Sequence, residues 1–69
     1  MNIAEMNLLA GGYDITVKKV DGLGVYLLDN RSNRYQKLCK DTEYRNVTKD
    51  KLMTELRYFT NKLHHRTQY

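Results

Sequence analysis

The chain has 69 residues, 41% of them hydrophobic and 29% charged, with no proline. A chain of this length forms one small domain over residues 1–69 and buries only about 60% of the surface exposed when it is unfolded. That size disfavours the walls of a large catalytic cleft, so we expect a non-enzymatic protein with no cofactor and no small-molecule substrate. Twelve Lys and Arg against eight Asp and Glu leave a net charge of +4, which favours acidic partners such as nucleic acid. A charge of this magnitude also serves solubility alone.

The cellular setting follows from the cysteine count and the apolar runs. Cys39 is the single cysteine and cannot form an internal disulfide, which excludes the disulfide-rich secreted class. The longest apolar runs, residues 8–10 and 25–28, fall far short of the ~20 residues of a membrane span. Glu5 stands where a secretory signal carries positive charge. We therefore expect a cytoplasmic protein without membrane contact.

Residues 2–10 predict a short helix. Asn2 is a suitable N-cap, and Glu5 follows three residues later, as in a capping box. The apolar side chains that share one face are Ile3, Met6 and either Leu9 or Ala10. We expect Gly11 and Gly12 to end the helix in a left-handed conformation. So short a helix has to dock on another element to persist.

Residues 13–20 alternate between apolar and polar side chains, which is the pattern of a half-buried strand. Asp21 and Gly22 then predict a hairpin turn. Residues 25–28 are apolar on both faces, and such a strand belongs in the middle of a sheet. A second copy of the chain is one candidate to cover the surplus apolar face, as a homodimer.

A third strand is expected over residues 34–40, after a polar turn at residues 29–33 whose residue types tolerate left-handed conformations. The alternation places Tyr35 and Cys39 on one face of this strand. Its Lys and Arg residues suit an exposed edge, where charge opposes sheet-to-sheet aggregation.

The last element is a long helix over residues 49–64. Thr48 is a suitable N-cap, and Val47 with Leu52 forms the pair of a hydrophobic staple. The apolar residues of this helix recur on one stripe: Leu52, Leu56, Phe59 and Leu63.

The element order is α-β-β-β-α. It predicts an α+β fold, in which a three-stranded antiparallel meander packs against the long C-terminal helix and carries a short N-terminal helix. The expected core consists of Ile15, Val17, Val25, Leu27, Leu52, Leu56, Phe59 and Leu63.

No residue pattern indicates catalysis or a metal. Cys39 with His64 or His65 would make a thiol–imidazole pair, but a part-buried structural thiol is the more ordinary role. Adjacent histidines on a helix point about 100° apart, so capping of the helix C-terminus is expected of them instead of metal binding. Gly22 and Gly24 lack the third glycine and the following helix of a phosphate-binding loop, which leaves them as turn residues.

Basic and aromatic residues form the remaining signal, in two groups. The first group lies on one flank of the long helix and consists of Lys51, Tyr58, Lys62 and His65. The second group lies in the second hairpin and consists of Arg31, Arg34, Tyr35, Lys37 and Lys40. Lys and Arg neutralise phosphates and tyrosine rings stack on bases, although a solvated helix face and a charged edge strand explain the same residues. Tyrosine is also common at protein interfaces.

The predicted order and length are similar to those of the double-stranded RNA-binding fold. Residues 48–54 stand in place of that family's Lys- and Ala-rich start of the last helix, but they include Asp50 and no alanine. The order of strands and helix also resembles the arm-binding domains of mobile-element integrases, which read DNA with their sheet. The composition is similar to that of bacteriophage accessory proteins, some of which inhibit host nucleases, polymerases or CRISPR complexes.

These observations support two functional hypotheses. The first is a small basic module that contacts nucleic acid, or a nucleic-acid-handling protein complex, through Lys, Arg and Tyr. The second is a bacteriophage-type accessory protein that inhibits a host protein by direct binding, for example an anti-CRISPR or a nuclease or polymerase inhibitor.

Overall fold

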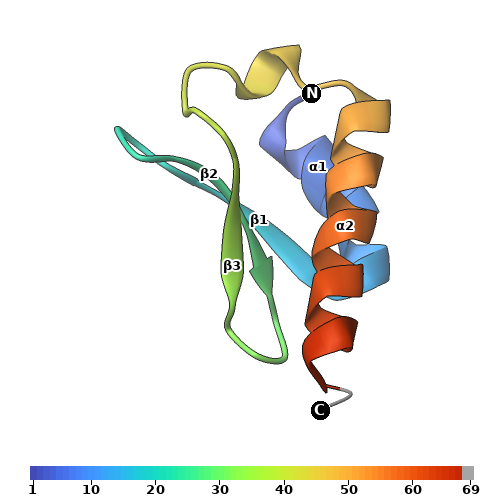
Figure 1. Cartoon of the computed structure of the whole chain (residues 1–69). Coiled ribbons are helices and arrows are strands. Elements are labelled where there is room, and N and C mark those ends of the chain that lie inside the picture. Colours follow the sequence, from blue (N-terminus) through green and yellow to red (C-terminus); the bar gives the residue numbers. More distant parts are fainter. Residues whose placement is uncertain (68–69) are drawn as a thin grey trace.

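The chain folds as a helix, an antiparallel meander and a second helix (Figure 1). The computed structural model describes residues 1–67, and the surroundings of side chains are described for residues 1–63. The elements are α1 (Ile3–Ala10), β1 (Ile15–Val20), β2 (Gly24–Asp29), β3 (Tyr35–Cys39) and α2 (Lys49–Thr67), with 3₁₀ turns η1 (Gly11–Tyr13) and η2 (Tyr44–Asn46). This layout confirms the predicted α+β fold.

Helix α1 begins as predicted and ends differently. The side-chain oxygen of Asn2 accepts a hydrogen bond from the Glu5 amide at 2.8 Å. Gly11 is right-handed (φ −58°), so the chain continues into η1 instead of stopping there. The left-handed residue is Asp14 (φ 58°), whose amide donates to the Gly11 carbonyl. The predicted glycine stop is therefore wrong, and Tyr13 belongs to η1 instead of to the following strand.

The sheet has the order β1-β2-β3, which confirms β2 as the central strand. In the first hairpin the Leu23 amide donates to the Val20 carbonyl at 3.0 Å, and Gly22 supplies a positive φ of 79°. A β-bulge interrupts the second pairing, because Val25 lies opposite Cys39 while the next residue of β2 lies opposite Lys37. Such a bulge moves the following side chain to the other face of the sheet.

The bulge corrects one prediction. Cys39 lies opposite Val25 and packs against the core, whereas Tyr35 lies opposite Leu28 and is 69% exposed. Tyr35 and Cys39 are therefore on different faces, because the extra residue in β3 breaks the alternation assumed from the sequence.

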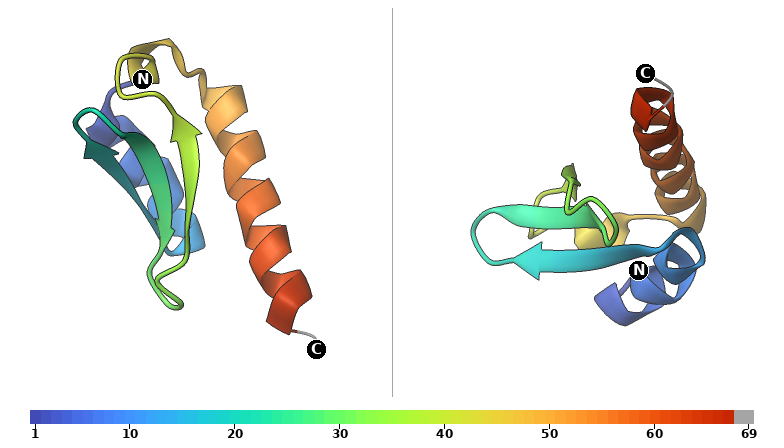
Figure 2. Two further views of the ribbon diagram at one scale, coloured as in Figure 1. Left: turned by 60° about the vertical axis from the view of Figure 1, so that its left-hand side comes forward. Right: turned by 90° about the horizontal axis from the view of Figure 1, so that it is seen from below.

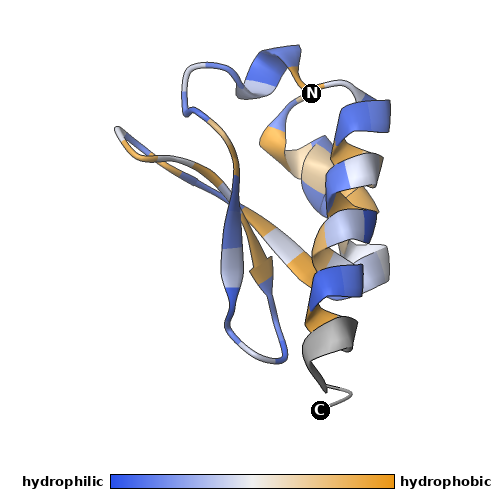
Figure 3. Cartoon of the chain, in the orientation of Figure 1, coloured by the Kyte–Doolittle hydropathy of each residue, from blue (hydrophilic) through white to orange (hydrophobic). Residues whose placement is uncertain are grey.

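The core lies on one face of the sheet. Its buried residues are Met6, Ala10, Ile15, Val17, Val25, Leu27, Leu52, Leu56 and Phe59. All predicted core residues are buried except Leu63, which is half-buried and packs at the edge of the cluster. Since this cluster includes side chains of both α1 and α2, the two helices cover the same face of the sheet (Figure 2). In Figure 3 hydrophobic residues are concentrated where α1 and the strands approach α2.

Helix α2 begins at its predicted cap, where the Thr48 hydroxyl accepts from the Lys51 amide at 3.1 Å. It continues to Thr67, past the predicted end at residue 64. The α-amino group of Met1 donates to the Val47 carbonyl at 3.0 Å and joins the start of α1 to the start of α2.

The side chain of Asn7 joins α1 to the outer edge of β1. Its amide nitrogen donates to the Val17 carbonyl at 3.0 Å, and its oxygen accepts from the Val17 amide at 2.8 Å. These are the two bonds that a neighbouring strand would make, so Asn7 closes this edge at Val17.

We expect Asn7→Ala to lower the free energy of unfolding by about 2 kcal/mol, because it leaves the Val17 amide and carbonyl without partners. Leu8→Ala is the matched control on the same helix, since Leu8 is 82% exposed. Urea unfolding of both variants measures the difference. Equal stability of the two variants would contradict this role of Asn7.

Candidate nucleic-acid interface

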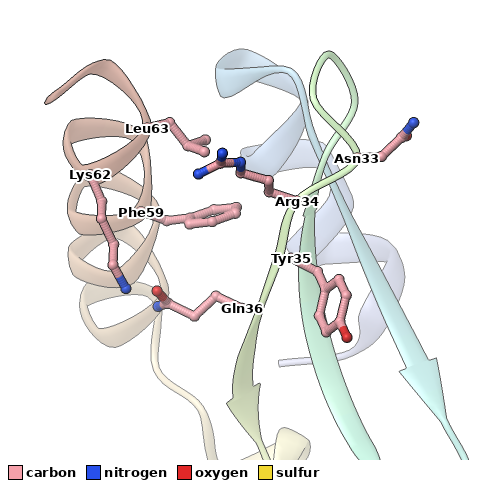
Figure 4. A pocket seen from close by; sticks show the side chains of 7 residues that line it. All are labelled: Asn33, Arg34, Tyr35, Gln36, Phe59, Lys62 and Leu63. Carbon is pink, nitrogen blue, oxygen red and sulfur yellow. The ribbon is translucent and has the colours of Figure 1, made fainter. Parts of the chain in front are cut away.

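A groove runs between β3 and α2 (Figure 4). The section near the end of α2 measures about 420 Å³ and is lined by Asn33, Arg34, Tyr35, Gln36, Phe59, Lys62 and Leu63. In Figure 4 the side chains of Arg34 and Gln36 point towards α2, whereas Tyr35 points away from the groove. Even-numbered residues of this part of β3 thus form one wall, and α2 forms the other.

A second hollow lies between β3 and the start of α2. It shares no lining residue with the first, and the two hollows together are called the groove below. This second section measures about 550 Å³ and is lined by Lys37, Leu38, Cys39, Lys40, Glu43, Asn46, Val47 and Lys51. A hydrogen bond crosses between the two walls, from the Gln36 amide to the Glu55 carboxylate at 3.3 Å. Glu55 also pairs with Lys51 at 3.1 Å.

The charges along the groove are predominantly positive. Among residues 1–63 the cationic residues of the lining are Arg34, Lys40, Lys51 and Lys62, with Lys37 at the rim, since its pairing with Tyr26 places its side chain on the outer face. Glu43 and the bridging Glu55 are the acidic residues beside them. A groove lined mainly by one sign of charge concentrates ligands of the opposite sign.

The fold therefore brings together the two groups of basic residues that the sequence predicted separately. Lys51 and Lys62 from the helix flank face the groove across from Arg34 and Lys40 of the second hairpin. Tyr58 is 60% exposed, and the Lys62 ammonium lies over its ring, 5.7 Å from the centroid.

Other predicted site residues lie elsewhere. Arg31 does not line the groove; it pairs with Asp14 at 3.1 Å and lines an adjoining hollow that shares Arg34 and Leu63 with the groove. Tyr35 points to the outer face of the sheet, the face turned away from α1 and α2. The side chain of His65 lies outside the described residues, as does that of His64.

The prediction missed two residues of that outer face, Lys18 and Tyr26. Both lie beside Tyr35 in a shallow hollow of about 370 Å³. The sequence does contain a signal for both residues. The alternation of β1 places Lys18 on the face opposite Val17, and residues 25–28 are apolar on both faces, which indicates a second apolar surface at Tyr26. The sequence could not show which face of the central strand the helices would leave open.

The thiol of Cys39 has the surroundings of a structural residue. Burial raises the pKa of the Cys39 thiol, and the nearby Glu43 carboxylate acts in the same direction. A protonated thiol is a poor nucleophile. Among the described residues no group of three His, Cys, Asp or Glu is placed to hold a metal ion.

The described helices include none long and apolar enough to cross a membrane. The sequence matches no protein-family model, and comparison with curated proteins and with solved structures found no match. Function has to be inferred from the groove, from the sheet and from the charges on them.

The turn that carries Arg34 into the groove depends on the Asp29 carboxylate, which is 8% exposed. It accepts from the Ser32 hydroxyl at 2.6 Å and from the Ser32 amide at 2.9 Å. These bonds from Ser32 lower the pKa of Asp29 below its ordinary value, against the opposing effect of burial. Because the pKa of Asp29 is lower in the folded protein, this carboxylate stabilises the fold fully at pH values above its unfolded-state pKa of about 3.9. The stabilisation is lost as the pH falls through the folded-state pKa.

We expect Ser32→Ala to lower the free energy of unfolding by about 1.5 kcal/mol at pH 7. Below about pH 4 the variant should lose less additional stability on acidification than the parent protein does. Urea unfolding from pH 7 to about pH 2.5 measures both effects, with Glu43→Gln as an exposed-carboxylate control. A variant that loses as much stability on acidification as the parent would contradict the role of Asp29.

Proposed function

We propose that this protein is a small non-enzymatic module that binds nucleic acid, free or held in a protein complex, along the groove between β3 and α2. One observation carries the proposal: basic residues from two segments far apart in the sequence face one another across that groove. Opposed cations of this kind suit a linear polyanion that lies between them.

Phosphate neutralisation supplies the binding energy. Each Lys or Arg that contacts a phosphate releases condensed counterions, and this term accounts for most sequence-independent affinity. Arg34 offers a planar fork of donors suited to phosphate oxygens, whereas Lys51 and Lys62 act as point charges.

The acidic residues of the groove do not prevent this binding. The Lys51 side chain is 58% exposed, and exposed ion pairs contribute little to stability. A phosphate that binds Lys51 competes with Glu55, whose carboxylate keeps its hydrogen bond from Gln36. Lys62 lies at the rim over the ring of Tyr58, and among residues 1–63 it has no ion pair that a phosphate would have to break.

The proposal predicts salt-sensitive binding of labelled single-stranded and duplex DNA, measured by fluorescence anisotropy. With about four phosphate contacts, affinity should fall roughly 10²-fold between about 50 and 200 mM salt. Lys51→Glu with Lys62→Glu should weaken binding at least about tenfold and reduce the log–log salt slope by about 1 per lysine.

The matched control is Lys49→Glu with Arg57→Glu, which makes the same change of net charge. Both residues are exposed on α2 and neither lines the groove. Equal affinity of the two double variants would contradict the groove as the site. Absence of binding at the lower salt concentration would instead favour the inhibitor that binds a host protein directly.

A further inference from the structure

The outer face of the sheet carries a pair of tyrosines. Tyr26 of β2 and Tyr35 of β3 lie edge to face, with ring centroids 5.7 Å apart and ring planes at 80°. Tyr26 is half-buried, whereas Tyr35 is 69% exposed. The ring of Tyr26 therefore supports that of Tyr35, and the exposed ring of Tyr35 remains accessible to a planar ligand.

Apolar side chains extend this surface. Val20 is 40% exposed and Leu23 is 62% exposed, and both line the same hollow as the tyrosines. Both helices of the described chain pack on the opposite face, so neither of them covers this one. Exposed aromatic and apolar side chains that lie together on a small domain indicate a binding surface.

The charges on this face are positive. Lys18 of β1 lies beside the tyrosines, and Lys37 lies opposite Tyr26. The Lys37 side chain runs across Gly24, where a Cβ atom would lie 2.7 Å from its Cε atom. The three strands place no carboxylate on this outer face. Its side chains come from Thr16, Lys18, Val20, Tyr26, Leu28, Tyr35 and Lys37.

From these observations we infer that the outer face is a stacking platform for unpaired bases, and that the protein therefore prefers single-stranded nucleic acid. This inference rests on the proposed function and specifies its ligand. Base stacking on aromatic side chains is tolerant of sequence, and a duplex, whose bases are already stacked on each other, does not offer it. Flanking lysines neutralise the phosphates that accompany the stacked bases.

Strand β3 connects the platform to the groove. Arg34 and Gln36 point towards α2, whereas Tyr35 and Lys37 lie on the outer face. A single strand that crosses β3 can therefore place some of its nucleotides in the groove and others on the platform.

Charge argues against a second copy of the chain as the occupant. Two copies packed face to face would enclose Lys18 and Lys37 of both chains in one interface without carboxylates from this face to pair with them. Enclosing like charges without partners is strongly unfavourable. The face suits a polyanion with planar groups better than it suits itself.

The test compares a labelled oligothymidine of about 12 nucleotides with a duplex of the same length, at about 50 mM salt. We expect Tyr35→Ala to weaken oligothymidine binding about tenfold and to change duplex affinity less than about twofold. Tyr35→Phe should retain the affinity, because it keeps the aromatic face. Leu8→Ala controls for the loss of an exposed apolar side chain elsewhere.

Tyrosine emission gives a second readout. The chain has no tryptophan, so its intrinsic fluorescence comes from tyrosine. Stacking of thymine on Tyr35 should quench part of this emission, and Tyr35→Ala should remove that part of the quenching.

The remaining outcomes overturn the inference in distinguishable ways. If oligothymidine binding depends on Lys51 and Lys62 but not on Tyr35, the stacking platform is wrong while the proposed function of the groove is retained. If neither the oligothymidine nor the duplex binds, both the proposed function and the stacking platform are wrong. Self-association in sedimentation velocity that Tyr35→Ala abolishes would assign the face to a second copy, and binding of polyglutamate with the same dependence on Tyr35 would assign it to an acidic protein.

Discussion

Helices α1 and α2 pack on the same face of a small sheet, and this shared packing decides which surfaces of the protein are buried. Alternating residues such as Val17 and Leu27 meet the apolar stripe of α2 on that face, while Met6 of α1 completes the same cluster. Asn7 then anchors α1 along β1. Because the helices share one face, neither covers the opposite face of the sheet, and of the two helices only α2 lines the groove beside β3.

Strand β3 has the central part in the proposed function because its two faces differ. One face presents Gln36 to the groove next to Arg34, which directly precedes the strand, and the other presents Tyr35 and Lys37 beside Tyr26. The bulge opposite Val25 turns Cys39 back into the core and so anchors the end of the strand. A polyanion with planar bases is a ligand that matches both faces together.

Much of the fold could be predicted because its signals are local. The caps at Asn2 and Thr48 and the apolar stripe of α2 act within a few residues. The bulge could not be predicted, since it depends on how β2 and β3 pair, and Asp14 is left-handed because the chain continues past Gly11 into η1. For the site, residue types in the two basic groups predicted their chemistry, but their convergence on one groove depends on how α2 crosses the sheet. The position of Arg31, paired with Asp14 in an adjoining hollow, is equally a tertiary effect.

The most direct test of this account is a two-dimensional amide NMR titration with oligothymidine. We predict chemical-shift changes in β3, around Tyr26 of β2 and along the groove side of α2 from Lys51 to Lys62. The amides of α1 around Asn7 should stay unchanged, because α1 lies on the covered face and touches neither surface. Shifts confined to α1 and the edge of β1, or no shifts at a concentration of oligothymidine that saturates single-strand binders, would contradict the account.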